Sequence, residues 1–294
     1  MGPTRIPIPV LTSFDRETFD REYRIPGRPV VFKGAASSWP AVRTWDPDSF
    51  ASRFGDLEIE PSINLPDTEV PYQFRDGDYR KKMSVRELVA LMKAGNRCYV
   101  DQVSATRFVG AESDFAFDSL GPDDLKDVVF WMGSHTRSGL HYDYVDNFFA
   151  QIHGTKRVVL ASPDQARFLH VFIDCHTKSA VAPLHPDLRK TPRLRRATLL
   201  DATLEPGDVL YLPKGWWHYF ASSESSISLA CWHGTPLTPA HDVKVMWSLR
   251  SPLAWLRLAW DFLWLGVLGR PYKRRLYSPP PTGRMVYELF FSKS

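Results

Sequence analysis

Two histidines and one aspartate have the residue types and spacing of a metal site. His141 and Asp143 are separated by one residue, and His218 lies far downstream. In a strand, residues i and i+2 project to the same side, so His141 and Asp143 would point together into a barrel, and a histidine from a later strand could join them. Two imidazoles and one carboxylate can occupy one face of an iron(II) octahedron and leave three positions open. We therefore predict a metal centre at these three residues.

A second His-x-Asp pair, His185 and Asp187, is less suited to this chemistry. Pro186 between them lacks the N–H that a central strand needs. The surrounding Val171–Arg196 is long, dotted with prolines and basic, and it separates two β-rich runs. We therefore expect this stretch to be a loop and not a ligand-bearing strand.

The sequence predicts that short strands and a few helices position these ligands. Clusters of Gly, Pro, Asp and Ser separate β-rich runs at Arg97–Val103, Asp127–Gly133, Asn147–His153, Lys156–Ala161, Ala197–Leu204, Asp208–Leu212, Trp217–Ala221 and Ser226–Trp232. Helical spacing is found at Phe14–Tyr23, Asp46–Phe54, Ser84–Ala94 and Pro239–Gly269, the last with a break near Ser251-Pro252. Closely spaced short strands predict a barrel or sandwich rather than alternating βαβ units.

Length and composition limit the class of protein. The 294 residues allow one large domain or two small ones, and 44% hydrophobic residues exclude a disordered or fibrous chain. Three cysteines without a Cys-x-x-Cys pair argue against a disulfide framework or a cysteine zinc site and favour a reducing compartment. The segment Met1–Leu11 has no apolar core of a signal peptide, so we expect a cytoplasmic protein.

Several motifs surround the predicted ligands. They are Arg28–Gly34 followed by Ser38-Trp39-Pro40, His141-Tyr142-Asp143 followed by Asn147–Gln151, Lys156–Leu160 after a Gly154-Thr155 turn, and Leu204–Pro213 before Trp216-Trp217-His218. In these motifs the chain resembles the cupin-like Jumonji-C dioxygenases, which use Fe(II), 2-oxoglutarate and O2. The similarity covers about residues 25–235 and includes both asparaginyl hydroxylases and tRNA wybutosine hydroxylases of that family.

The resemblance implies a fold and a set of site residues. It implies a mainly β protein with flanking helices: a double-stranded β-helix (jelly-roll, cupin-like) core in a catalytic domain at 1–235, and a C-terminal helical segment with a basic, proline-rich tail at 236–294. The positions that match the family's iron ligands are His141, Asp143 and His218, those that match its 2-oxoglutarate contacts are Lys156, Tyr99, Ser138 and Asn147, and those on the substrate side are Asp101 and Gln102. Lys156 would pair with the distal carboxylate of 2-oxoglutarate, since a buried carboxylate needs a cationic partner.

One position departs from the family pattern. Some relatives carry an asparagine where Ala230 falls in the run Ser228–Trp232. Either a polar contact to the co-substrate is missing here, or Ser228 replaces it.

The predicted function is hydroxylation of a C–H bond by an Fe(II)- and 2-oxoglutarate-dependent oxygenase, with a protein or peptide side chain as the first choice of substrate. A small molecule, a tRNA base and N-methyl demethylation remain alternatives. The tRNA alternative depends on the basic residues of 178–196, which phosphate would attract unless they are only a solvated surface. A non-enzymatic cupin-like binding module is the alternative from another class, and the intact triad and Lys156 argue against it.

The apolar segment Leu253–Leu268 needs a partner. It is shorter than the ~20 residues of a membrane-spanning helix and contains Arg257 and Asp261, which can pair four residues apart. We expect it to pack on the core or across a homodimer. Membrane association at the surface, helped by Arg270 and Lys273–Arg275, is the less favoured alternative.

Overall fold

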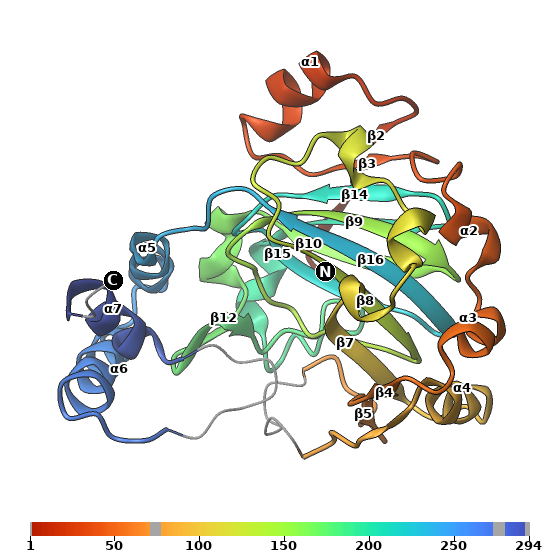
Figure 1. Ribbon diagram of the computed structural model, residues 1–294. Helices are drawn as coiled ribbons and strands as arrows, with labels where there is room; N and C mark the ends of the chain where they lie inside the picture. Colours follow the sequence, from red (N-terminus) through yellow and green to blue (C-terminus); the bar gives the residue numbers. More distant parts are fainter. Residues whose placement is uncertain (1, 71–77, 273–279, 292–294) are drawn as a thin grey trace.

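Two β-sheets stacked face to face form the centre of the computed structural model, which describes residues 2–70, 78–272 and 280–291 (Figure 1). In spatial order, the larger sheet contains β2 (Val10–Leu11), β3 (Val30–Phe32), β14 (Val209–Leu212), β9 (Asp146–His153), β16 (Ser225–His233), β8 (Asp127–Ser134), β7 (Cys98–Ser104) and β5 (Ser62–Ile63). The smaller sheet contains β1 (Thr4–Pro7), β13 (Thr198–Leu204), β10 (Lys156–Ala161) and β15 (Trp217–Ala221). This mostly β core with flanking helices confirms the predicted cupin-like jelly-roll class.

Helices and two short strand pairs surround the sheets. The helices are α1 (Arg16–Phe19), α2 (Pro40–Thr44), α3 (Pro47–Phe54), α4 (Val85–Lys93), α5 (Pro239–Ser248), α6 (Pro252–Asp261) and α7 (Thr282–Phe291), with π-helical turns at Asp20–Arg24 and Phe262–Val267. The strand pairs are β4 (Glu58–Ile59) with β6 (Met83–Ser84), and β11 (Val171–Phe172) with β12 (Cys175–Ser179). In Figure 1, α2, α3 and α4 lie at one side of the sheets, and α5, α6 and α7 lie at the other.

The eight predicted strands and the four predicted helical stretches are confirmed, with small shifts of their ends. Helix α4 begins at a capping box, in which the Ser84 hydroxyl accepts from the Glu87 N–H and the Glu87 carboxylate accepts from the Ser84 N–H. Helix α3 begins at Asp46, whose carboxylate accepts from two backbone N–H groups. The predicted helix break near Ser251-Pro252 separates α5 from α6.

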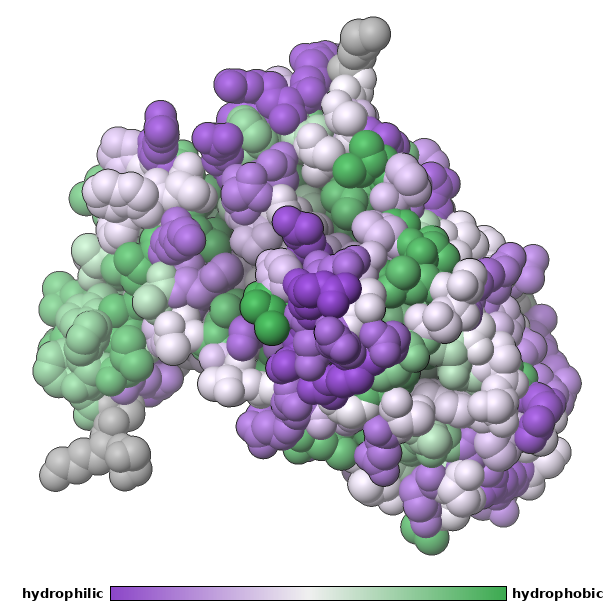
Figure 2. Space-filling view, turned by 90° about the horizontal axis from the view of Figure 1, so that it is seen from above, coloured by the Kyte–Doolittle hydropathy of each residue, from purple (hydrophilic) through white to green (hydrophobic). Residues whose placement is uncertain are grey.

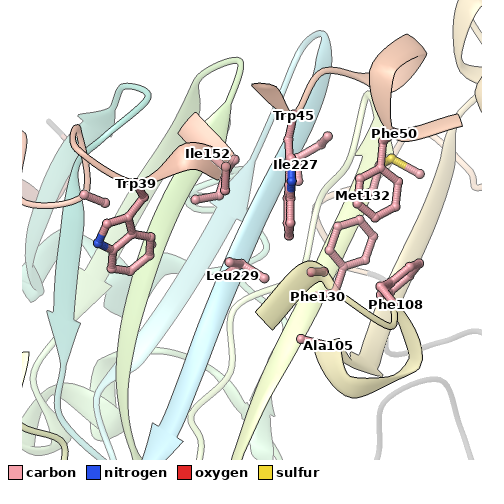
Figure 3. Close-up of a cluster of buried hydrophobic side chains, with 14 of the residues drawn as sticks. Trp39, Trp45, Phe50, Ala105, Phe108, Phe130, Met132, Ile152, Ile227 and Leu229 are labelled. Atoms are coloured by element: carbon pink, nitrogen blue, oxygen red, sulfur yellow. The ribbon is translucent and has the colours of Figure 1, made fainter. Parts of the chain in front are cut away.

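The outer face of the larger sheet carries an aromatic core. Phe130 of β8 stacks on Phe50 of α3 with ring centroids 4.7 Å apart, and Trp45 and Phe108 pack against the same cluster (Figure 3). The helices α2, α3 and α4 therefore bury the outward-pointing side chains of these strands. Because successive side chains alternate between faces, the inward-pointing set is left to line the space between the two sheets.

That inner space is apolar except for a few polar side chains. Val158 and Leu160 of β10 face Phe149 of β9 and Ala230 of β16 in one buried cluster, whereas Val159 packs outward with α5. Lys156 lies two and four residues before Val158 and Leu160 on β10, so its side chain points to the same inner face. His218 is paired with Leu160 on the neighbouring strand, so its side chain points inward as well. The alternation thus sends both predicted site residues into the same inter-sheet space.

The expectation that Val171–Arg196 is a loop throughout is wrong for Val171–Phe172, which forms β11, and for Cys175–Ser179, which forms β12. All five of its side chains are buried. Its Thr177 C=O accepts a hydrogen bond from Tyr142 N–H, and its Ser179 N–H donates to Leu140 C=O. Mostly polar residues form this strand because it lies between the His141 segment and α5, where its polar groups find partners. His185 and Asp187 lie outside any strand, as predicted.

The C-terminal segment is a small helical bundle. Arg257 and Asp261 of α6 pair at 2.8 Å, which confirms the predicted intrahelical contact. Helix α7 lies within the stretch that we expected to be only a basic, proline-rich tail, and Lys273–Arg275 lie outside the described residues. Among the helices described, none combines the length and the apolarity that crossing a membrane requires. A domain boundary near residue 235 remains a prediction.

Candidate metal centre

The predicted triad converges at one end of the space between the sheets. His141, Asp143 and His218 each offer one ligand atom, and these atoms lie within 4.8 Å of one another. His141 Nε2 is 3.9 Å from Asp143 Oδ1, and His218 Nε2 is 3.5 Å from Asp143 Oδ2. The Asp143 side chain is 34% exposed, so the cluster opens toward solvent. A search of the described residues for three or more His, Cys, Asp or Glu side chains placed to hold a metal ion finds this triad.

The backbone around the ligands explains their convergence. His141 and His218 exchange two backbone hydrogen bonds of 3.1 and 2.6 Å, and Gly215 N–H donates to Asp143 C=O at 2.9 Å. The expectation that His141 and Asp143 lie in a regular strand is wrong, because His141 forms only isolated bridges, to His218 and to Lys178. The two side chains nevertheless reach the same site.

Both histidines are held in the form that binds a metal. His141 Nδ1 lies 3.0 Å from Gly139 C=O, and His218 Nδ1 lies 3.0 Å from Trp216 C=O. A carbonyl can only accept, so we assign the proton of each neutral ring to Nδ1, which leaves the Nε2 lone pair free toward Asp143. Burial lowers the pKa of both rings, for His141 well below its usual range. Neutral imidazoles are therefore present at neutral pH.

Lys156 is a buried cation deeper in the same space. The residue is only 1% exposed, and burial lowers the pKa of its amine to about 7. Nζ donates to Ser228 Oγ at 2.9 Å, and that hydroxyl donates to Gln151 Oε1 at 2.8 Å. Over the described residues, no carboxylate lies within ion-pair distance of Nζ. With a pKa of about 7 the amine is only partly charged at neutral pH. An anionic group brought by a ligand would stabilise its charged form, so the position fits such a group.

Two aromatic rings connect Lys156 to the triad. Nζ lies 5.1 Å from the ring centre of Phe149, which stacks on Phe220 at 4.3 Å. Phe220 in turn packs edge-on against His218 at 5.7 Å. Lys156 and the metal ligands therefore face the same inter-sheet space and are connected through these two packed rings.

This inter-sheet region also contains buried polar atoms whose hydrogen-bonding capacity is not used. Asn147 Oδ1, Trp131 Nε1 and Trp232 Nε1 are buried and have no hydrogen-bond partner among the described residues. Asn147 and Trp232 are register neighbours on β9 and β16. Trp131 packs against Tyr99 at 5.6 Å, and Tyr99 itself is 5.6 Å from Lys156 Nζ. Since buried polar groups are normally satisfied, these atoms fit a small polar ligand such as a keto dicarboxylate.

Ser138 and Ser228 have different surroundings. Ser138 Oγ accepts from Phe220 N–H at 3.0 Å and donates to Gly139 C=O, so it ties the His141 segment to β15. Ser228 and Ala230 both point between the sheets. Ala230 is fully buried in the apolar cluster, and Ser228 holds Lys156. Whether Ser228 also replaces the co-substrate contact that the family asparagine makes remains a prediction.

The predicted substrate-side residues do not lie together. Asp101 is buried and pairs with Arg80 at 2.9 Å, whereas Gln102 is exposed and has a positive φ of 53° at an irregularity in β7. Lys178, which we assigned to the basic loop, is instead buried beside His141 and close enough to lower its pKa. Its polar sequence context carries no strand signal, so sequence reasoning missed it.

Comparison with known proteins agrees with this architecture. Residues 16–238 match the family described as "Cupin-like domain". The chain is 28% identical over 238 residues to lysine-specific demethylase 8 of Xenopus tropicalis, covering 76% of this chain and 52% of that protein. It is 27% identical over 272 residues to tRNA wybutosine-synthesizing protein 5 of Danio rerio, covering 85% and 82%. Jumonji C domain-containing protein 5 of Drosophila melanogaster is 24% identical over 245 residues, covering 76% and 59%.

The chain spans about half the length of the first of these relatives and most of the second. The matched family region extends from α1 to the residue before α5. It contains the triad, Lys156 and every strand of the two sheets except β1 and β2. On this match, which covers most of the chain, the protein belongs to the cupin-like JmjC domain family.

Proposed function

We propose that this protein is an Fe(II)- and 2-oxoglutarate-dependent oxygenase that hydroxylates a C–H bond. One observation carries the proposal: a two-histidine, one-carboxylate cluster faces the same inter-sheet space as the buried amine of Lys156, which has no carboxylate partner among the described residues. The ligand set suits iron(II), and the cation suits the far carboxylate of a dicarboxylic co-substrate. A binding module without chemistry would not need both groups, so the non-enzymatic alternative is disfavoured.

In this proposal each site residue has a separate role. His141, Asp143 and His218 would hold the iron, which when bound supplies the activation of O2. Lys156 would pair with the distal carboxylate of 2-oxoglutarate, with Tyr99 beside it. Asn147, whose buried Oδ1 has no partner among the described residues, would be a further polar contact to the co-substrate, while Ser138 secures the backbone next to His141. The reaction balances as R–H, O2 and 2-oxoglutarate giving R–OH, succinate and CO2.

A protein or peptide side chain is the substrate that we place first. The support is the relative named for lysine-specific demethylation and the open side of the triad at Asp143. N-methyl demethylation would use the same groups, because a hydroxylated N-methyl group breaks down to formaldehyde. A small-molecule substrate would use the same site. The substrate-side roles of Asp101 and Gln102 are part of this proposal.

A tRNA base is the second candidate, favoured by one surface feature. The relative named tRNA wybutosine-synthesizing protein 5 is matched over most of its length. The segment after β12 carries exposed cations at Arg189, Lys190, Arg193, Arg195 and Arg196. Phosphate contacts from these side chains would make RNA binding fall steeply with salt.

The surface of the C-terminal helices is strongly apolar (Figure 2). Large exposed hydrophobic side chains there are Trp247, Leu253, Leu256, Trp260, Leu263, Trp264, Val267, Leu268, Leu289, Phe290 and Phe291. Monomeric proteins rarely expose so large a contiguous apolar patch. We propose a homodimer through these helices, with membrane association as the less favoured alternative. The three buried free cysteines fit the reducing cytoplasm in which we place the protein.

The dimer predicts a simple result. Leu256→Glu with Trp260→Glu puts two charges on the exposed face and should convert the dimer to a monomer, because burying a charge is costly. Sedimentation equilibrium of both proteins, with flotation on anionic vesicles in parallel, measures it. A wild-type monomer that floats with vesicles would favour the membrane alternative.

The metal prediction concerns the three ligands. Wild type should bind one Fe(II) per chain, and Asp143→Ala and His218→Ala should lose most of it, together with 2-oxoglutarate-dependent succinate formation. Elemental analysis after anaerobic loading and a succinate assay measure the two properties. His185→Ala is the matched control, because His185 belongs to the other His-x-Asp pair and should keep both. Full iron retention by Asp143→Ala would contradict the proposed site.

A prediction for Lys156 tests the co-substrate pocket. Lys156→Ala should raise the KM for 2-oxoglutarate at least ~10-fold while iron still binds, since a charge-assisted contact contributes roughly 1.5–3 kcal/mol. The exposed Lys190→Ala is the control and should leave KM unchanged. An unchanged KM in Lys156→Ala would mean that another cation holds the carboxylate.

The substrate prediction uses mass spectrometry. Incubation with Fe(II), 2-oxoglutarate and ascorbate should give peptides heavier by about 16 Da, or lighter by about 14 Da after demethylation, with wild type but not with Asp143→Ala. Separate protein, tRNA and small-molecule extracts are compared. A modified nucleoside with unmodified protein fractions would replace the first substrate choice by the second.

A further inference from the structure

A buried carboxylate on α5 joins the two residues that alternate with the metal ligands. Tyr142 lies between His141 and Asp143, and Tyr144 follows directly. Both hydroxyls donate to the same atom, Asp242 Oδ1, at 2.8 and 3.0 Å. Asp242 is fully buried. Residues 141 and 143 therefore face the metal cluster, while 142 and 144 face the C-terminal helices.

Other contacts close the same network. His176 of β12, also fully buried, pairs with Asp242 Oδ1 through Nε2 at 2.9 Å, and its Nδ1 contacts the Thr282 hydroxyl at the start of α7. Three donors thus converge on one carboxylate oxygen, which offsets the cost of burying its charge. The backbone is joined as well, because Leu237 N–H donates to Tyr144 C=O at 2.7 Å.

Packing fixes the direction of Tyr142. Its ring contacts Trp217 edge-on at 5.0 Å and His241 at 5.2 Å. Trp217 precedes His218, so the same tyrosine touches the elements that carry both parts of the triad. A shift of Tyr142 would move His141 and Asp143 together, because the three residues are consecutive in an irregular segment that no long strand holds.

We propose that Asp242 is a positioning residue that sets the geometry of the metal-ligating segment through Tyr142 and Tyr144. This inference rests on the proposed metal site. It assigns the C-terminal helices a function in that site, although α5 lies outside the matched family region. Partners of metal ligands commonly change metal affinity or activity 10–100-fold.

The test is metal affinity in a double variant. Tyr142→Phe with Tyr144→Phe removes both hydroxyls but keeps both rings, and it should weaken Mn(II) binding at least ~10-fold in anaerobic titrations. Tyr211→Phe is the matched control, because this buried hydroxyl also donates to a carboxylate, Asp146, at 3.3 Å but lies outside the segment. The Mn(II) affinity of Tyr211→Phe should stay within about threefold of the wild-type value.

Further readouts separate positioning from stability. The visible spectrum of the Co(II)-loaded protein should change in the double variant but not in Tyr211→Phe. Asp242→Asn, which keeps an acceptor oxygen, should lose less Mn(II) affinity than Asp242→Leu. Thermal unfolding of the metal-free proteins shows whether each variant folds.

Two outcomes have different meanings. A folded double variant with wild-type Mn(II) affinity and Co(II) spectrum overturns the positioning function while leaving the metal site intact. Wild-type Mn(II) affinity in Asp143→Ala overturns the metal site itself and, with it, the proposed oxygenase function.

Discussion

The alternation of side chains along extended backbone is the constraint on which this site depends. On β10 it sends Lys156 between the sheets while Val159 packs against the outer helices. On β15 it sends His218 inward and Trp217 outward. The segment around Asp143 keeps the same alternation without being a regular strand. The same alternation that builds the sandwich thus directs the metal-ligand cluster and Lys156 into one inter-sheet space and leaves Tyr142 and Tyr144 on the outer side, where α5 holds them.

The polar groups buried at this site lower the stability of the fold. A lysine with only neutral partners and a buried asparagine oxygen without one both reduce the free energy of unfolding. The aromatic clusters on the outer faces compensate, because Phe50, Phe108 and Phe130 are each almost completely buried (Figure 3). Proteins commonly break local rules at functional sites and offset the cost elsewhere. An anionic ligand would remove much of this cost, which favours binding.

The predictability of each part follows from how local its signal is. The strands around Phe149 and His218 and the capped helix at Ser84 were predictable from apolar runs, turn residues and caps. The triad was predictable because family motifs surround it. Strand β12 was not, since its residues are mostly polar and are buried only by tertiary contacts. Helix α7 was missed because tertiary contacts also hold it in place. Gly283 packs so closely against the backbone of α6 that a Cβ would not fit, and this contact is visible only in the folded bundle.

The central claim is that the triad and Lys156 hold one ligand between them, and thermodynamic linkage tests it most directly. Calorimetric titration of 2-oxoglutarate into the protein, with and without Mn(II), measures whether the two binding events are coupled. If one molecule touches both the metal and Lys156, Mn(II) should tighten 2-oxoglutarate binding by at least ~10-fold, and Lys156→Ala should weaken the remaining metal-dependent binding. Equal 2-oxoglutarate affinity with and without the metal would contradict the account.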